Sequence, residues 1–189
     1  MFNPVIVEKV GKSVHNFDVD TKLYQNRIVY LTGEINGDRA KEVITQLLYL
    51  DSVDTADINL YINSEGGSVT DGLAIADTMQ ILKSNINTTG IGLCASMGAI
   101  LLVSGTGERR CTKNCQILLH TVSSCTGYSD VHQSRADMDH QELLNNVLFD
   151  IICSNSDIQK EELERITQHD CWLTAEQALK YKIVDRILE

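Results

Sequence analysis

The chain has a single proline among its 189 residues, few aromatic residues (5%) and no long apolar run. No Pro-rich linker, low-complexity segment or internal repeat divides it, so we expect one domain over residues 1–189. The longest apolar run, around residues 97–103 (MGAILLV), is far shorter than the roughly 20 residues of a membrane-spanning helix. The N-terminus also lacks the apolar core of a secretory signal. We therefore expect a cytoplasmic protein without membrane contact.

Basic residues are also scarce, with 16 Lys and Arg against 26 Asp and Glu and a formal net charge of −10. An acidic surface repels phosphate backbones, so we do not expect nucleic-acid binding. The glycine-rich stretch at residues 64–72 (SEGGSVTDG) matches neither phosphate-binding motif. Glu65 and Asp71 would repel a bound phosphate there, so this stretch is not predicted to bind nucleotides.

The cysteines have no spacing typical of a disulfide framework, and we expect free thiols. They are Cys94, Cys111, Cys115, Cys125, Cys153 and Cys171. Cys111 and Cys115 have the spacing of half a zinc site, but His120 is the only histidine nearby and a second ligand pair is missing. We therefore predict no metal and no other cofactor.

What the chain does have is a regular alternation of strand and helix patterns. Strand patterns cover residues 26–33, 57–63, 86–95, 115–120 and 182–188. Helical patterns cover residues 37–52, 68–83, 96–105, 130–153 and 160–168, and a last helix follows Thr174. Ser68 with Asp71, and Thr174 with Gln177, have the spacing of capping boxes. The predicted fold class is α/β.

Ser96 lies at a predicted strand-to-helix turn within GIGLCASMGAILLVSG, residues 90–105. Ligands and catalytic groups collect at such strand ends in open α/β folds, and free N–H groups at a helix start favour developing negative charge. The hydrolase pattern G-x-S-x-G is incomplete, because Cys94 replaces its first glycine. Close packing of small residues alone also accounts for a serine here, so the prediction of a nucleophile depends on its partners.

A serine nucleophile needs two N–H donors that face the developing oxyanion. Gly66 and Gly67 can turn their N–H groups inward because no Cβ is in the way, and the N–H of Met97 directly follows the serine. The alternative is that the two glycines only open the following helix.

The serine also needs a base, and His120 is the histidine that ends an apolar strand. His132 and His140 fall on the polar face of the long predicted helix, where solvated residues are usual. Asp170 is the candidate acid, since Cys171 and Trp172 follow it and could shield a hydrogen bond from Asp170 to His120. Taken singly, His120 fits a structural role and Asp170 an exposed loop.

Five stretches together resemble the proteolytic subunit of the Clp protease, in order and over nearly the whole chain. They are YLTGEI, LYINSEGGSVTDGLAIADTMQ, GLCASMGAILLVSG, ILLH and HDCWLTAEQALKYKIVDRIL. The resemblance implies a crotonase-like ββα spiral with a protruding handle helix. It also implies a serine endopeptidase that forms two stacked heptameric rings and cleaves unfolded polypeptides delivered by a hexameric AAA+ unfoldase.

Carried onto this sequence, the resemblance makes Ser96 the nucleophile, His120 the general base and Asp170 the group that orients the imidazole. Gly67 and Met97 become the oxyanion donors. Residues from about 125 to 155 become the handle, and those up to about 17 the axial-pore loop. The dock for the unfoldase retains Tyr61, Ile81, Ile91 and Leu188.

The sequence also departs from the family pattern, which has SPGG where this chain has SEGG. Glu65 therefore replaces a proline, and the loop TVSSCTGYSD after His120 is shorter than the Pro- and Gly-rich stretch of the family. Within the dock, polar side chains replace apolar ones at Asn59, Thr89 and Thr112. Two alternatives to an active peptidase follow: a weakly active ring subunit that scaffolds an active paralogue in mixed rings, or a crotonase-type acyl-CoA enzyme with Glu65 as its carboxylate.

Overall fold

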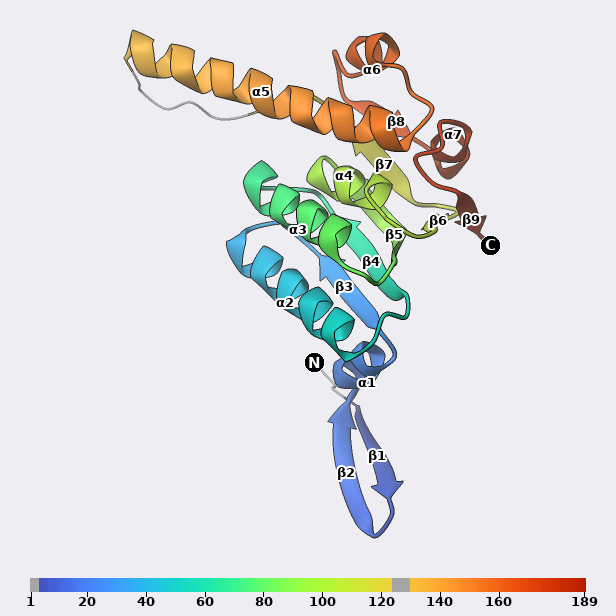
Figure 1. Cartoon of the computed structure of the whole chain (residues 1–189). Coiled ribbons are helices and arrows are strands. Elements are labelled where there is room, and N and C mark those ends of the chain that lie inside the picture. Colours follow the sequence, from blue (N-terminus) through green and yellow to red (C-terminus); the bar gives the residue numbers. More distant parts are fainter. Residues whose placement is uncertain (1–3, 124–129) are drawn as a thin grey trace.

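A mostly parallel sheet forms the centre of the computed structural model, which describes residues 4–123 and 130–189 (Figure 1). Five strands run parallel in the order β3 (Ile28–Thr32), β4 (Ile58–Ser64), β5 (Ile86–Ala95), β6 (Arg109–Thr112) and β9 (Arg186–Leu188). β7 (Gln116–Leu119) runs parallel to the last residues of β5, and β8 (Cys171–Leu173) pairs antiparallel with β7. The predicted α/β class is confirmed.

One face of this sheet is covered by α2 (Gly37–Val53), α3 (Val69–Ile81) and α4 (Met97–Val103) (Figure 1). The cause is the period of two in β4, whose inward side chains Ile58, Leu60 and Ile62 are fully buried. The helices bury matching apolar stripes, which include Val43, Leu47, Ile75 and Met79. The core therefore lies between the sheet and these three helices.

The long helix α5 (Val131–Asn155) extends well beyond the body, and only its C-terminal part packs against the core (Figure 1). Its buried residues are Leu148, Phe149 and Ile152. The helix confirms the predicted helical pattern over residues 130–153. The first part of the expected handle falls on residues 124–129, which lie outside the described residues. α6 (Lys160–Ile166) and α7 (Ala175–Lys180) follow α5.

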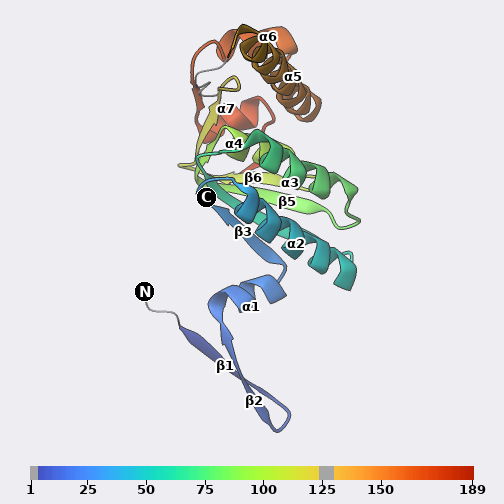
Figure 2. The same cartoon turned by 90° about the vertical axis from the view of Figure 1, so that its left-hand side faces the viewer.

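At the other end, the antiparallel hairpin of β1 (Val5–Val10) and β2 (Ser13–Asp18) projects away from the body (Figure 2). It leads through α1 (Val19–Gln25) into the sheet. The residue pattern did not predict this hairpin, because Val5, Val7 and Val14 are all exposed and no buried face imposes an alternation. The expected axial loop up to about residue 17 corresponds to it, apart from residues 1–3, which lie outside the described residues.

The last predicted strand, residues 182–188, is shorter than expected, since only Arg186–Leu188 is a strand. Lys182, which follows the last residue and the C-cap of α7, has a positive φ of 55°. The N–H of Ile183 then bonds the Ala178 carbonyl, so Ile183 and Val184 are buried in a helix-ending turn. Thr174 and Gln177 do form the predicted capping box at the start of α7. None of the described helices is long and apolar enough to cross a membrane.

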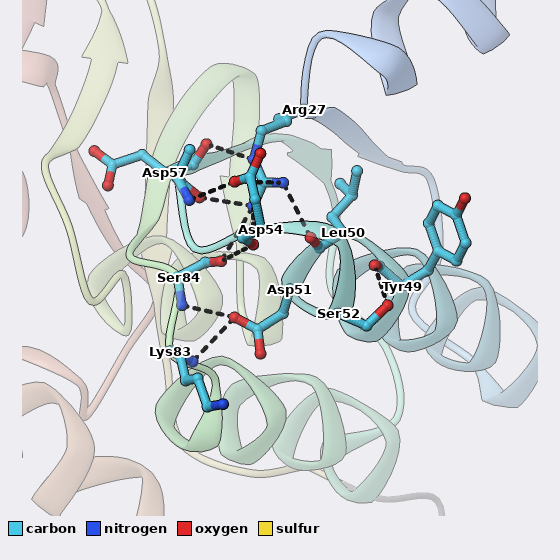
Figure 3. A network of polar contacts seen from close by, with 10 residues as sticks. Arg27, Tyr49, Leu50, Asp51, Ser52, Asp54, Asp57, Lys83 and Ser84 are labelled. Carbon is cyan, nitrogen blue, oxygen red and sulfur yellow. Dashed lines mark hydrogen bonds and ion pairs between the residues drawn. The ribbon is translucent and has the colours of Figure 1, made fainter.

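Arg27 lies just before β3, at the end of the parallel sheet opposite Ser96, which follows β5. It is the centre of a cluster of polar contacts (Figure 3). Its guanidinium donates hydrogen bonds to the carbonyls of Leu50, Asp54, Ala56 and Asp57 and to the hydroxyl of Ser84. Next to it, Asp51 accepts the N–H groups of Lys83 (3.0 Å) and Ser84 (2.7 Å). These hydrogen bonds, chiefly the one from Ser84, lower the pKa of Asp51. The cluster fixes the end of α2 against the starts of β4 and β5.

Replacing Arg27 by Met tests this cluster. We expect the free energy of unfolding to fall by about 3 kcal/mol, because several main-chain carbonyls lose a charged donor. The control is Arg39→Met, which removes a half-buried arginine paired with Glu42 and should change stability by no more than about 0.5 kcal/mol. Urea unfolding at one fixed protein concentration measures both. Equal effects of the two substitutions would contradict the role given to Arg27.

Candidate active site

Ser96 forms a sharp turn between β5 and α4, with φ 53° and ψ −124°. Such a backbone conformation costs a residue other than glycine about 1–3 kcal/mol, and it persists only where the surrounding structure holds it. Here the N–H of Ser96 donates to the Leu118 carbonyl of β7 (2.9 Å), and the Ser96 carbonyl accepts from Ala99 (2.9 Å). The turn leaves Ser96 half-buried at the end of the sheet.

The main chain at Gly66 and Gly67 passes directly against this turn. Both residues have positive φ, 95° and 146°. A Cβ at Gly66 would lie 2.7 Å from the Ser96 Cβ and 2.8 Å from the Ala95 carbonyl oxygen, and one at Gly67 would overlap the Ile35 carbonyl. Neither position can carry a side chain without moving the backbone. The two glycines are therefore required for the close approach, beyond any role in opening α3.

Two N–H groups near Ser96 remain outside the local hydrogen-bond ladder. The bridge between Ile35 and Gly67 uses the N–H groups of Ile35 and Ser68, each with a 2.8 Å bond, and so leaves out the N–H of Gly67. The N–H of Met97 is the first of the four that a helix leaves without an intrahelical partner. The predicted oxyanion donors thus flank the serine, with Gly67 and Ser96 lining one cavity.

Ser64, which was not identified from the sequence, stabilises the Gly66–Gly67 turn from the buried end of β4. Its side chain is 1% exposed, donates to the Gly33 carbonyl (2.7 Å) and accepts the N–H of Gly66 (3.0 Å). The signal that could have identified it is its register, because it continues the buried alternation of Ile58, Leu60 and Ile62. A polar residue at a buried strand position is expected to have hydrogen-bond partners.

The pairing of β7 with β8 places His120 and Asp170 opposite each other. Leu119 pairs with Cys171 in this antiparallel ladder, so one further step along each strand puts His120 across from Asp170. His120 also lines the cavity that contains Ser96. Residues separated by dozens of positions in the sequence are therefore brought to one end of the sheet by strand register.

Ser96, His120 and Asp170 lie at the same end of the sheet, but their side chains are not hydrogen-bonded to one another. Among the described residues, no hydrogen bond links Ser96 with His120 or His120 with Asp170. Asp170 is exposed, and Trp172 is 52% exposed. The Asp170–His120 hydrogen bond that Cys171 and Trp172 were expected to shield is therefore not formed in the single chain, and the role of Asp170 stays a prediction.

A cavity of about 250 Å³ opens beside Ser96. Its polar lining consists of Glu65, Gly67, Ser96, His120, Thr121 and Ser123. Its apolar lining, called the apolar wall below, includes Val69 of α3, Ile100 of α4, and Leu148, Phe149 and Ile152 of α5. Sequence reasoning missed this wall, although the change from polar to apolar residues near the end of α5 marks it. The cavity can accept an aliphatic side chain next to the serine hydroxyl.

Cys94, two residues before Ser96, does not compete as a nucleophile. It is fully buried and donates a weak hydrogen bond to the Ile62 carbonyl. A hydrogen bond with Cys115, together with burial, raises the pKa of the Cys94 thiol well above its usual value, so the thiol stays protonated. No group of three or more His, Cys, Asp or Glu side chains within residues 4–123 and 130–189 could hold a metal ion.

Comparison with known proteins agrees with this arrangement. The family described as Clp protease matches residues 11–189. The chain belongs to the Clp protease family. Curated relatives named "ATP-dependent Clp protease proteolytic subunit" include those of Streptococcus sanguinis, 37% identical over 98% of this chain and 96% of the relative, and Carsonella ruddii, 36% identical over 100% and 97%. A Borreliella burgdorferi relative, named as subunit 1, is 38% identical over 98% and 96%.

The family assignment confirms the resemblance and decides between the alternatives. Relatives named as Clp proteolytic subunits match along nearly their whole length. Neither a crotonase-type acyl-CoA enzyme nor a weakly active scaffold is favoured by these matches. The roles of Ser96, His120, Asp170, Gly67 and Met97 stay predictions that rest on the geometry above.

The structure places only some of the residues of the expected unfoldase dock on one surface of this Clp protease subunit. The register of β4, β5, β6 and β9 places Tyr61 and Leu188 on the sheet face that α2, α3 and α4 leave uncovered. Ile91 lies in β5 where the pairing with β4 shifts register, so the ladder does not fix its face. Tyr61 stacks on Tyr30 there, with ring centroids 5.2 Å apart. Ile81 instead ends α3, in the helix layer, and is 77% exposed.

The polar residues of the dock lie on the same sheet face. Asn59 accepts a hydrogen bond from Arg110 (2.8 Å). Thr89 is 1% exposed, and its hydroxyl has no partner among the described residues. Thr112 pairs with Leu188 across β6 and β9. The dock on this chain is therefore mixed in character, with a polar centre.

Replacing Gly67 by Ala tests the oxyanion turn. We expect peptide hydrolysis to fall by about 100-fold or more, because the added Cβ overlaps the Ile35 carbonyl and displaces one N–H donor. The control is Gly33→Ala, which has φ 75° but open space around its Cβ and should cost only about 1 kcal/mol of stability. Circular dichroism confirms folding of both variants. A folded Gly67→Ala variant with normal turnover would show that Gly67 is not a donor.

Proposed function

We propose that this protein is a proteolytic subunit of an ATP-dependent Clp protease, a serine-type endopeptidase that hydrolyses peptide bonds of unfolded polypeptides. The observation that carries the proposal is the Ser96 turn, held in a strained conformation and pressed against the Gly66–Gly67 main chain beside a cavity that also contains His120. A packing role for Ser96 would not require this strain or the two glycines. The family membership supports the same reaction.

In the proposed reaction, the Ser96 hydroxyl attacks the peptide carbonyl and His120 takes its proton. The N–H groups of Gly67 and Met97 stabilise the negative charge on the carbonyl oxygen. His120 then gives the proton to the departing amine, which leaves an ester between Ser96 and the acyl half of the substrate. Water, activated by His120, hydrolyses this ester and restores the serine. Asp170 orients His120 and stabilises its charged form.

The missing hydrogen bonds between the three side chains are compatible with this reaction. Catalytic hydrogen bonds are often long without substrate and tighten in the reacting complex. Asp170 follows α6 and precedes the short β8, and His120 precedes residues 121–123 at the cavity edge. Contacts with a neighbouring subunit at these exposed segments would shield the Asp170–His120 pair from water and so strengthen it.

The proposed assembly is two stacked heptameric rings with a hexameric AAA+ unfoldase as partner. α5 would be the handle between rings, since Val131 and Met138, seven residues apart, expose apolar side chains on one face of its protruding part, and Leu143 is exposed on another face. The β1–β2 hairpin would surround the axial entrance. The sheet face of Tyr61 and Leu188, with Ile91 and Ile81 nearby in the ring, would receive the unfoldase. We place this single-domain subunit in the cytoplasm.

Replacing Ser96 by Ala tests the proposed function. Peptide hydrolysis should fall by at least about 1,000-fold, because only positioning and oxyanion binding remain. Asp170→Asn should lower turnover by as much as about 10⁴-fold with little change in KM. Light scattering should show unchanged assembly for both variants. Ser52→Ala, an exposed serine on α2, is the control and should keep full activity. Full turnover by the Ser96→Ala variant would refute the proposal.

A further inference from the structure

Glu65 occupies a fixed place beside the proposed nucleophile. It lies between Ser64 and Gly66, and the bond from the Gly66 N–H to the Ser64 hydroxyl (3.0 Å) closes the turn around it. Ser64 and Gly66 are both buried, while Glu65 is exposed and lines the cavity that holds Ser96 and His120. The backbone that carries Glu65 is therefore anchored, and its carboxylate is confined to the neighbourhood of the cavity.

The charge of Glu65 is not neutralised by this chain. Within residues 4–123 and 130–189, Glu65 has no ion-pair or hydrogen-bond partner. No Lys or Arg lines the cavity, whose one other titratable side chain among the described residues is His120. The sequence of residues 124–129, SCTGYS, contains no Lys or Arg either. An occupant of the cavity therefore meets one uncompensated carboxylate.

This charge would oppose catalysis unless something offsets it. The oxyanion that forms between Gly67 and Met97 is negative, and a nearby carboxylate disfavours it. A cation supplied by the substrate would offset the carboxylate when the oxyanion forms. The apolar wall of Ile100, Leu148 and Phe149 suits an aliphatic stem, and Glu65 suits a cationic end. Lys and Arg side chains combine these two properties.

We propose that Glu65 makes this site favour substrates with Lys or Arg at the residue whose carbonyl Ser96 attacks. The aliphatic part of that side chain lies along the apolar wall, and its ammonium or guanidinium group pairs with the Glu65 carboxylate. Glu65 is thus a specificity-determining residue. This inference rests on the proposed peptidase function, and the experiment below separates the two.

The test uses four peptide amides that release aminomethylcoumarin and differ only in their last residue: Lys, norleucine, Gln or Glu. Norleucine has the aliphatic chain of Lys without the ammonium group. We expect the ratio of kcat/KM for Lys over norleucine to be about fivefold higher in the wild type than in Glu65→Gln, the upper range for an exposed ion pair. This difference should shrink strongly in about 1 M salt, where charges are screened.

Two further variants sharpen the result. Glu65→Lys should reverse the preference and favour the Glu substrate over Gln. Glu164→Gln, which removes an exposed carboxylate on α6 outside the cavity, is the matched control and should keep the wild-type ratio. An unchanged Lys-to-norleucine ratio in Glu65→Gln, with normal cleavage of the norleucine peptide, would overturn the proposed specificity and leave the peptidase function standing.

A chain that turns over none of the four peptides is tested by covalent labelling instead. Amino-acid phosphonates with Lys or norleucine side chains react with a serine nucleophile without turnover. The rate of Ser96 labelling, followed by mass spectrometry, should show the same fivefold dependence on Glu65. Equal rates in the wild type and Glu65→Gln would overturn the specificity alone, whereas no labelling of Ser96 by either phosphonate would overturn the specificity and the proposed function together.

Discussion

The close contact between two main-chain segments, Gly66–Gly67 and the Ser96 turn, is the constraint on which the rest of the structure depends. Gly66 approaches the Ser96 Cβ so closely that no side chain fits between them. Ser64 supports this contact from the core, and the bridge from Ile35 to Gly67 supports it from the neighbouring strand end. The strain at Ser96 is tolerated because these bonds and the β5–β7 pairing hold the turn from several sides.

The same contact explains why the chemistry lies at this end of the sheet. Parallel strands bring the ends of β4, β5 and β7 together, so the glycine turn, the serine and His120 meet without being close in sequence. β8 adds Asp170 through an antiparallel pairing, and α5 closes the cavity with its last buried turns. At the opposite end of the sheet, Arg27 links α2 with the starts of β4 and β5. The site is thus a product of the strand register.

Most of the fold could be predicted from the sequence wherever one face of an element is buried. The strand over residues 86–95 and the helix over residues 37–52 follow from their apolar spacing. The hairpin of β1 and β2 has no buried face, and β6 and β8 are only 4 and 3 residues long, too short for a period to show. Their positions depend on pairing partners that the local sequence does not encode.

Some residues of the candidate site have a local sequence signal, and others do not. Ser96 and the glycine pair could be identified from small residues at a strand end, and His120 from the end of an apolar strand. Asp170 had no comparable local signal, since its place opposite His120 comes from the β7–β8 register. Ser64 and the apolar residues of α5 were missed because the sequence alone does not show what they pack against. Their place beside the site is set by tertiary contacts.

Covalent labelling would show whether Ser96 is an activated nucleophile. The purified full-length protein would be incubated with a fluorophosphonate, and the modified residue would be mapped by tandem mass spectrometry. We expect one adduct per chain, on Ser96, and slower labelling in the Asp170→Asn variant because the base is no longer correctly oriented. Labelling of another serine, or an unmodified Ser96 in an assembled and folded protein, would contradict this expectation.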